Sequence, residues 1–172
     1  THVLNNKCIQ GLYSPGSTFK MVTAAAALEY GVIKPDTEIN CEGFFRLGRA
    51  RMDCWKRSGH GYLNVVQAIE NSCNVFFYKV SMELGIDKIK EYARKFGLGS
   101  LTGIDLRSEL SGVVPDGAWK MKRFNQEWLK GETPNVAIGQ GYVTVTPLQL
   151  INYINVIANK GYYVKPRVVK QF

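Results

Sequence analysis

The clearest helix in the sequence starts at the stretch Ser14-Pro15-Gly16-Ser17-Thr18-Phe19-Lys20. Pro and Gly mark a turn there, and the alanine-rich segment after it predicts a helix over residues 18–30 that ends at Gly31. Alanine is small and favours helix, so we expect this helix to be buried. The stretch therefore places a serine and a lysine at the start of a core helix.

Ser17 and Lys20 are three residues apart, which predicts that their side chains share one face of the helix. A serine hydroxyl is a good nucleophile only when a base removes its proton, and a lysine can do so when burial or a nearby cation lowers its pKa. Backbone N–H groups at a helix start can also stabilise an oxyanion. The plainer interpretation is a serine cap beside a solvated lysine, and this pair alone does not decide between the two.

The composition indicates one globular domain over residues 1–172. Hydrophobic residues make up 45% of the chain and charged residues 21%, which excludes disorder, collagen and simple repeats and allows a core without disulfides. The 22 basic and 14 acidic residues give a net charge of +8, which favours anionic neighbours such as a phospholipid surface or a carboxylate substrate. The sequence has no initiator Met, no signal peptide and no apolar run of about 18 residues, so we expect a piece of a longer protein with any anchor upstream.

Helical periodicity dominates the rest of the chain. Residues 34–62 show no sustained period and are expected to be loop, with short strands only at 38–41 and 44–47. The last residues, 164–172, are typical of the start of a strand. Further helices are expected at 64–70, 75–84, 87–96 and 148–159, with a loop over 98–118 and no assignment for 119–131.

Two further blocks could carry chemistry. Ser72-Cys73-Asn74 follows a predicted helix break, where a hydroxyl and an amide could relay a proton and hold a substrate carbonyl, although both residue types also cap helices. The second block runs Asn135-Val136-Ala137-Ile138-Gly139-Gln140-Gly141 and continues to Thr144-Val145-Thr146-Pro147-Leu148-Gln149-Leu150. Its glycines permit close backbone approach, and the alternative is an ordinary turn before a helix.

In this order, the three blocks resemble the transpeptidase domain of class B penicillin-binding proteins. The matching residues are Tyr13-Ser14-Pro15-Gly16-Ser17-Thr18-Phe19-Lys20, residues 68–78 around Ser72-Cys73-Asn74, and Gly139-Gln140-Gly141 with residues 146–150. The resemblance implies an α+β fold of the penicillin-binding-protein transpeptidase and serine β-lactamase type. It also implies that a D-Ala-D-Ala stem peptide or a β-lactam acylates Ser17, that Lys20 is the general base, and that Ser72 and Asn74 complete the proton path and hold the substrate.

One element of the family pattern is absent from the sequence. The family carries Lys-Thr-Gly or Lys-Ser-Gly on the strand lining the cleft, no such triplet follows Asn74, and the similar Arg57-Ser58-Gly59 precedes Ser72. We therefore expect a helix-rich chain truncated before that strand, acylated slowly or not at all. The resemblance further implies a lipid-linked precursor, a membrane glycosyltransferase of the elongation machinery, and a place on the periplasmic side of a bacterial inner membrane.

Three cysteines and a histidine predict a metal site. Their order is Cys41-x12-Cys54-x5-His60-x12-Cys73, and four such ligands suit a structural Zn²⁺ that would fix the irregular loop beside Ser72. Relatives that the chain resembles carry acids, His and Cys around the same loop. The alternatives are a Cys41–Cys54 disulfide, or buried inert thiols with a surface histidine. Asp53 is a possible substitute ligand.

Other functions remain open on the sequence alone. A non-catalytic module that binds a β-lactam or a partner would share Ser17, and a β-lactamase of the same fold would need an additional base for deacylation, which we cannot assign. The basic residues favour a solvated face, and no basic stripe interleaved with aromatic residues indicates nucleic acid. Those basic residues are Arg46, Arg49, Arg51, Lys56 and Arg57.

Overall fold

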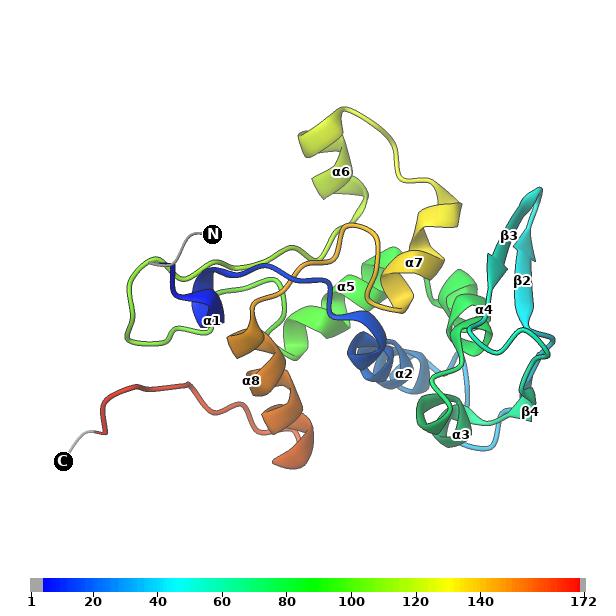
Figure 1. Cartoon of the computed structure of the whole chain (residues 1–172), viewed down its shortest axis with the longest axis horizontal. Coiled ribbons are helices and arrows are strands. Elements are labelled where there is room, and N and C mark those ends of the chain that lie inside the picture. The colour runs from blue at the N-terminus through cyan, green and yellow to red at the C-terminus, as the bar shows by residue number, and fades with distance from the viewer. Residues whose placement is uncertain (1–4, 171–172) are drawn as a thin grey trace.

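A computed structural model describes residues 5–170. Helices surround a central helix, and two antiparallel two-stranded ribbons lie at one side (Figure 1), which confirms the expected α+β class. The helices are α1 (Lys7–Gln10), η1 (Gly16–Phe19, a 3-10 helix), α2 (Lys20–Glu29), α3 (Val65–Glu70), α4 (Asn74–Leu84), α5 (Ile86–Lys95), α6 (Gly117–Phe124), η2 (Lys130–Glu132, a 3-10 helix), α7 (Thr133–Ala137) and α8 (Pro147–Ala158). The strands are β1 (Ile39–Cys41), β2 (Phe44–Leu47), β3 (Ala50–Asp53) and β4 (Gly61–Leu63).

The core is built around α2. This helix packs against α4 and α5, and α4 packs in turn against α7. Three of the four alanines of α2, Ala24, Ala26 and Ala27, are buried as predicted, because their small side chains let the neighbouring helices approach. Large apolar side chains fill the remaining space, among them Phe19, Val22, Phe76, Phe77 and Ile89, none of which is exposed.

The start of α2 differs from the predicted single helix over 18–30. Residues 16–19 form the 3-10 helix η1, and the α-helix begins only at Lys20. Gly16 enters this turn with a φ of +57°, and Thr18 Oγ1 donates to Pro15 O at 2.8 Å. In a 3-10 helix, side chains three residues apart are eclipsed, so the tight turn aligns Ser17 with Lys20.

The predicted break near Asn71 and Ser72 is confirmed. An Asn64–Gln67 capping box begins α3, and α4 begins at Asn74, one residue earlier than predicted. Between them, Ser72 has a φ of +49°, a left-handed conformation that costs a residue with a side chain about 1–2 kcal/mol. Cys73 then caps α4, because its Sγ accepts from Phe76 N at 3.5 Å.

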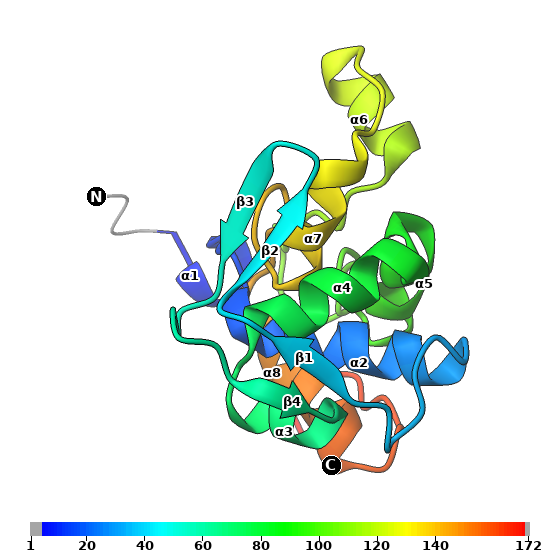
Figure 2. The same ribbon diagram turned by 90° about the vertical axis from the view of Figure 1, so that its right-hand side faces the viewer.

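The loop over residues 34–62 contains more strand than the sequence indicated. The expected strands appear as β1 and β2, but β3 and β4 were not predicted, because strands of three or four residues are too short to show a period. β1 pairs with β4 (Ile39 opposite Leu63), and β2 pairs with β3 (Phe45 opposite Met52). Figure 2 shows the β2–β3 hairpin projecting beside α4, while β4 lies next to α3 and β1 lies next to α4.

Three other segments differ from what the sequence indicates. Residues 119–131, for which the sequence gives no assignment, include most of α6 and the start of η2. The buried Lys120 of α6 forms an ion pair with Glu132 of η2, with 2.7 Å between Nζ and Oε1. Residues 133–137, considered as part of a turn, form the short helix α7. The prediction of a strand over 164–172 was wrong for residues 164–170, which pair with no described strand. Residues 171–172 lie outside the described residues.

No helix in the described part is long and apolar enough to span a bilayer.

Gly139 brings the glycine block against the turn that carries Ser17. Gly16 N donates to Gly139 O at 2.9 Å, and a Cβ on Gly139 would lie 2.3 Å from Gly16 O and 2.7 Å from Phe19 Cβ. The predicted close backbone approach is therefore present. α8 supports the same turn, since the buried Tyr153 donates its hydroxyl to Thr18 O at 2.9 Å.

We predict that Gly139→Ala destabilises the chain far more than Gly141→Ala. Both glycines have a φ of +71°, so both substitutions carry a conformational cost of about 1–2 kcal/mol. Only the Cβ at 139 meets backbone, whereas the Cβ at 141 would lie at an ordinary 3.6 Å from Asn135 Cβ. Urea unfolding should show at least about 2 kcal/mol more loss for Gly139→Ala, because overpacking adds that much. Equal losses would show that the close approach is unimportant.

Candidate active site

Four predicted residues converge from two segments that are far apart in the sequence. Ser17 lies exposed in η1, and Lys20 follows at the start of α2 with only 2% of its surface exposed. Ser72 and Asn74 come from the junction between α3 and α4. The packing of α2 against α3 and α4 places the junction over the amine of Lys20. The structure thus gathers a solvent-accessible hydroxyl above a buried amine.

Hydrogen bonds connect the four side chains. Lys20 Nζ lies 2.7 Å from Ser72 O, 2.9 Å from Ser72 Oγ and 2.7 Å from Asn74 Oδ1. Ser72 Oγ lies 2.9 Å from Ser17 Oγ. Among the described residues, Ser17 Oγ has Ser72 Oγ and not Lys20 Nζ as its side-chain partner. The sequence places Ser17 and Lys20 on one face and indicates that Ser72 could relay a proton, and the structure places Ser72 Oγ between the two groups.

The direction of this chain of hydrogen bonds depends on the charge of Lys20. A main-chain carbonyl and an amide oxygen only accept, so Nζ donates to Ser72 O and Asn74 Oδ1 in either charge state. An ammonium group donates its third proton to Ser72 Oγ, which then donates to Ser17. A neutral amine instead uses its lone pair to accept from Ser72, and Ser72 accepts from Ser17. Only the neutral form draws the proton away from Ser17.

Burial moves Lys20 toward the neutral form. The loss of water around Nζ lowers the pKa of Lys20 from 10.5 to about 8, and the electrostatic influence of Cys54 and Cys73 opposes part of that shift. A minor fraction of the Lys20 side chains is therefore neutral near pH 7. A small but useful population of base is present near neutral pH.

The predicted metal ligands also come together. One ligand atom from each of Cys41, Cys54, His60 and Cys73 lies within 4.8 Å of all the others. His60 Nδ1 is 3.5 Å from Cys41 Sγ and 3.6 Å from Cys54 Sγ. Tetrahedral Zn²⁺, with bonds of about 2.3 Å to sulfur and about 2.0 Å to nitrogen, separates such atoms by about 3.6 Å. The donor set and its spacing fit zinc.

The backbone of the loop holds these ligands in place. Cys54 N donates to Gly43 O at 2.8 Å, and His60 N donates to Cys41 O at 3.0 Å. A Cβ on Gly59 would lie 2.2 Å from Cys41 O, so only glycine permits this crossing.

Of the two alternatives to a metal site, the structure lacks the disulfide, whereas free buried thiols are what it contains at Cys41, Cys54 and Cys73. All four cysteines are free, so the Cys41–Cys54 disulfide is absent. Asp53 accepts from Arg51 Nε at 2.8 Å and is not part of the cluster. Cys8 lies apart from the cluster and is exposed.

The cluster and the catalytic candidates share one turn of backbone. Cys73 lies between Ser72 and Asn74, and its Sγ belongs to the cluster. One contact at this turn was not foreseen: the main-chain carbonyl of Ser72 accepts from Lys20, and a side-chain motif gives no signal for such a contact. The cluster of cysteines and His60 and the hydrogen-bonded group of Ser17, Ser72 and Lys20 are therefore connected through the backbone at Cys73.

Comparison with known proteins gives a consistent set of relatives. The family model for the penicillin binding protein transpeptidase domain matches residues 2–172. The chain is 42% identical over 169 residues to peptidoglycan D,D-transpeptidase MrdA of Acinetobacter baumannii, covering 97% of the chain and 25% of that relative. The chain thus spans about a quarter of the length of that relative.

Solved structures of similar proteins share the fold. Penicillin-binding protein PBP2 of Helicobacter pylori in complex with MreC superposes with a TM-score of 0.92 at 41% identity, over 95% of this chain and 31% of that chain. PBP2 of Pseudomonas aeruginosa in complex with WCK 5153 also has a TM-score of 0.92, at 36% identity, over 95% of this chain and 38% of that chain. The arrangement of helices and ribbons is therefore that of known structures.

We predict that Lys20 titrates near pH 8 in the folded chain. The measurement is the ¹³Cε or ¹⁵Nζ shift of labelled lysine against pH, with the urea-unfolded chain as control, where the pKa should return to about 10.5. Because the unfolded state keeps its proton up to the higher value, the contribution of this group makes the free energy of unfolding rise between pH 8 and 10.5. A folded-state pKa at or above 10 would contradict the burial argument.

Proposed function

The chain belongs to the family of penicillin-binding protein transpeptidase domains, and on that premise we propose that it forms the acyl-enzyme of a peptidoglycan D,D-transpeptidase through Ser17. The observation that carries the proposal is the chain of hydrogen bonds from Ser17 Oγ through Ser72 Oγ to Lys20 Nζ, at 2.9 Å for each step. It provides a nucleophile, a proton path and a partly neutral base at one place.

The geometry supports a specific order of proton transfer. Ser17 Oγ–H passes its proton to Ser72 Oγ while Ser72 passes its own to the neutral amine of Lys20. Ser17 Oγ then forms a bond to the carbonyl carbon of the penultimate D-Ala or of a β-lactam. As the C–N bond breaks, the Lys20 ammonium returns a proton to the leaving nitrogen along the same path, and the product is an ester on Ser17.

Transfer rather than hydrolysis completes the proposed reaction. The amine of a second stem peptide attacks the ester and restores the Ser17 hydroxyl, forming the cross-link. Asn74 remains bound to Lys20 through Oδ1, which leaves its amide nitrogen to hold a substrate carbonyl. The similarity to the D,D-transpeptidase of Acinetobacter baumannii supports a transpeptidase over the β-lactamase and the non-catalytic module.

The expected partners and location follow from the same premise. The substrates are stem peptides of lipid-linked precursors, and β-lactams act as inhibitors by acylation. A membrane glycosyltransferase of the elongation machinery would supply the glycan strands, on the periplasmic side of a bacterial inner membrane. The Helicobacter pylori relative was solved with MreC, which supports membership of a multiprotein assembly.

We also propose that the Cys41–Cys54–His60–Cys73 cluster holds a structural Zn²⁺. The ligand spacing supports this, because the four ligand atoms lie within 4.8 Å of one another and His60 Nδ1 lies 3.5 Å from Cys41 Sγ and 3.6 Å from Cys54 Sγ. A bound ion would supply no step of the reaction. It would fix the loop over residues 41–60 to Cys73 and thereby stabilise the turn that carries Ser72 and Asn74.

We predict that prolonged incubation with penicillin G adds one penicillin to Ser17. Intact-mass and peptide mass spectrometry locate the adduct. Ser17→Ala should abolish it, while Ser14→Ala, an exposed serine three residues earlier, should leave it unchanged. The absent Lys-Thr-Gly or Lys-Ser-Gly triplet leaves slow acylation and no acylation open, and because the hydrogen bonds from Ser17 through Ser72 to Lys20 are in place we expect the slow reaction, over hours. An adduct that survives Ser17→Ala, or none after a day, would contradict the proposal.

We predict one zinc ion per chain. Elemental analysis after extensive dialysis should give about one equivalent, and Cys54→Ser should reduce it to less than half. Cys8→Ser is the matched control, because Cys8 is exposed and outside the cluster. Chelation should also lower the thermal unfolding midpoint of the unmodified chain, since ion binding stabilises only the folded state. Zinc-free protein with an unchanged midpoint would contradict the site.

A further inference from the structure

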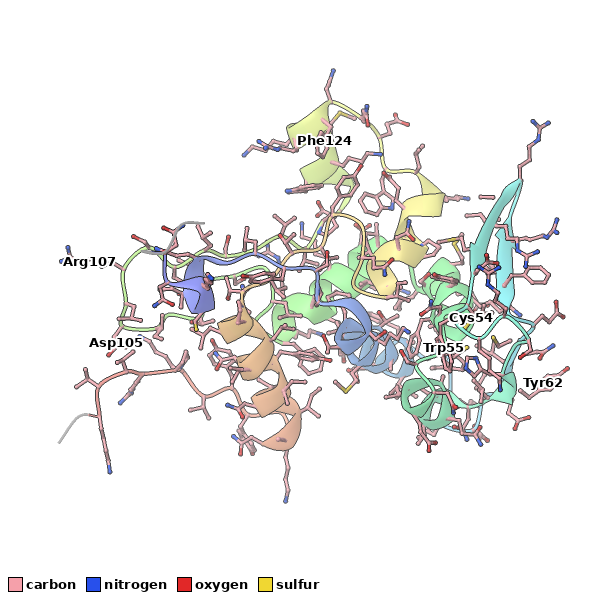
Figure 3. All side chains as sticks on the ribbon, in the orientation of Figure 1. Cys54, Trp55, Tyr62, Asp105, Arg107 and Phe124 are labelled. Carbon is pink, nitrogen blue, oxygen red and sulfur yellow. The ribbon has the colours of Figure 1, made fainter. Side chains whose placement is uncertain are left out.

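Trp55 is a large aromatic side chain that is mostly exposed to solvent. Its relative exposure is 63%, and it follows Cys54 directly in the sequence (Figure 3). Two contacts fix the indole ring. Its Nε1–H donates to Asn71 O at 3.0 Å, and the ring meets the His60 ring edge-on with the centroids 5.2 Å apart. The hydrogen bond to Asn71 O joins the loop over residues 34–62, here called the cysteine loop, to the end of α3.

The acceptor of that hydrogen bond belongs to the peptide unit leading into Ser72. The N–H of the same unit, on Ser72, donates to Ile69 O at 3.0 Å. Because a peptide unit is planar, one hydrogen bond at its oxygen and one at its nitrogen fix its tilt. The tilt sets the φ of Ser72, which is +49° and left-handed. Serine adopts this conformation only uncommonly, because its side chain makes a positive φ unfavourable.

A change in φ at Ser72 would disturb the proton path. Ser72 Oγ lies 2.9 Å from both Ser17 Oγ and Lys20 Nζ, and Ser72 O lies 2.7 Å from Nζ. Rotation toward the commoner negative φ would displace the hydroxyl from at least one of its partners, because hydrogen bonds weaken steeply beyond about 3.2 Å.

We propose that Trp55 is a positioning residue for Ser72: its indole N–H holds the peptide unit between Asn71 and Ser72 in the orientation that places Ser72 Oγ between Ser17 and Lys20. Trp55 touches none of the reacting atoms. The inference rests on the proposed function, because the path it aligns is the one proposed for acylation. It assigns a role near the site to a side chain of the cysteine loop that lies outside the three sequence blocks around Ser17, Ser72 and Gly139.

The test compares Trp55→Phe with Tyr62→Phe. Phenylalanine keeps an aromatic ring beside His60 and removes only the N–H donor. Tyr62 is the matched control, because it lies on β4 in the same loop, is 69% exposed, and makes no side-chain hydrogen bond within residues 5–170. Both substitutions are at exposed positions, so the fold should persist with the thermal midpoint of the unmodified chain.

Two measurements decide the outcome. Hydrogen exchange at the Ser72 amide should become at least tenfold faster in Trp55→Phe and stay within twofold in Tyr62→Phe. Penicillin acylation, followed as a function of concentration, should show an acylation rate constant about tenfold lower in Trp55→Phe with the dissociation constant of the first complex changed less than twofold. That split separates positioning from a general loss of structure, which would change both constants.

Either of two results would overturn the inference. One is a Ser72 amide in Trp55→Phe that exchanges within twofold of the unmodified chain. The other is faster exchange with an unchanged acylation rate constant, which would show that the turn does not control the chemistry. An unmodified chain that is never acylated contradicts the proposed function instead, and amide exchange alone then decides whether Trp55 holds the turn.

Discussion

The buried amine of Lys20 is the constraint on which the site depends. A lysine removed from water must find oxygen partners, and those available to it are the carbonyl and hydroxyl of Ser72 and the amide of Asn74. These three bonds fasten α2 to the junction between α3 and α4. The same burial that makes the bonds necessary lowers the pKa of Lys20 to about 8, so one packing arrangement sets both the geometry of the site and the proton affinity of its amine.

Close backbone contacts keep this arrangement rigid. Gly139 lets the end of α7 meet Gly16 directly, and Tyr153 supports Thr18 from α8, so the turn carrying Ser17 is held from two sides. On the opposite side, Cys73 joins the metal-ligand cluster to the turn that carries Ser72. The left-handed φ of Ser72 is strained, and such strain persists only where surrounding contacts determine the conformation.

The cysteine loop shows how an irregular segment acquires a defined structure. Residues 34–62 have no large apolar stripe, and their strands are only three or four residues long. Glycine crossings at residues 43 and 59 and the convergence of three thiols and an imidazole add to the packing of Ile39, Phe45 and Met52 against the core. Trp55 then carries this order to Asn71 through a single hydrogen bond. A loop without catalytic groups of its own thus bears directly on the site.

The sequence by itself determined the helices with long amphipathic or alanine-rich patterns, the break before Ser72, and the residue types and spacing of both candidate clusters. These follow from local rules, because propensity, capping and the i to i+3 relation act within a few residues. Only the tertiary structure decided that Ser72 lies between Ser17 and Lys20, that β3 and β4 form, and that Trp55 reaches Asn71. Each of these depends on segments that are distant in the chain, and pairing between distant segments is set by packing of the whole fold rather than by any short stretch of residues.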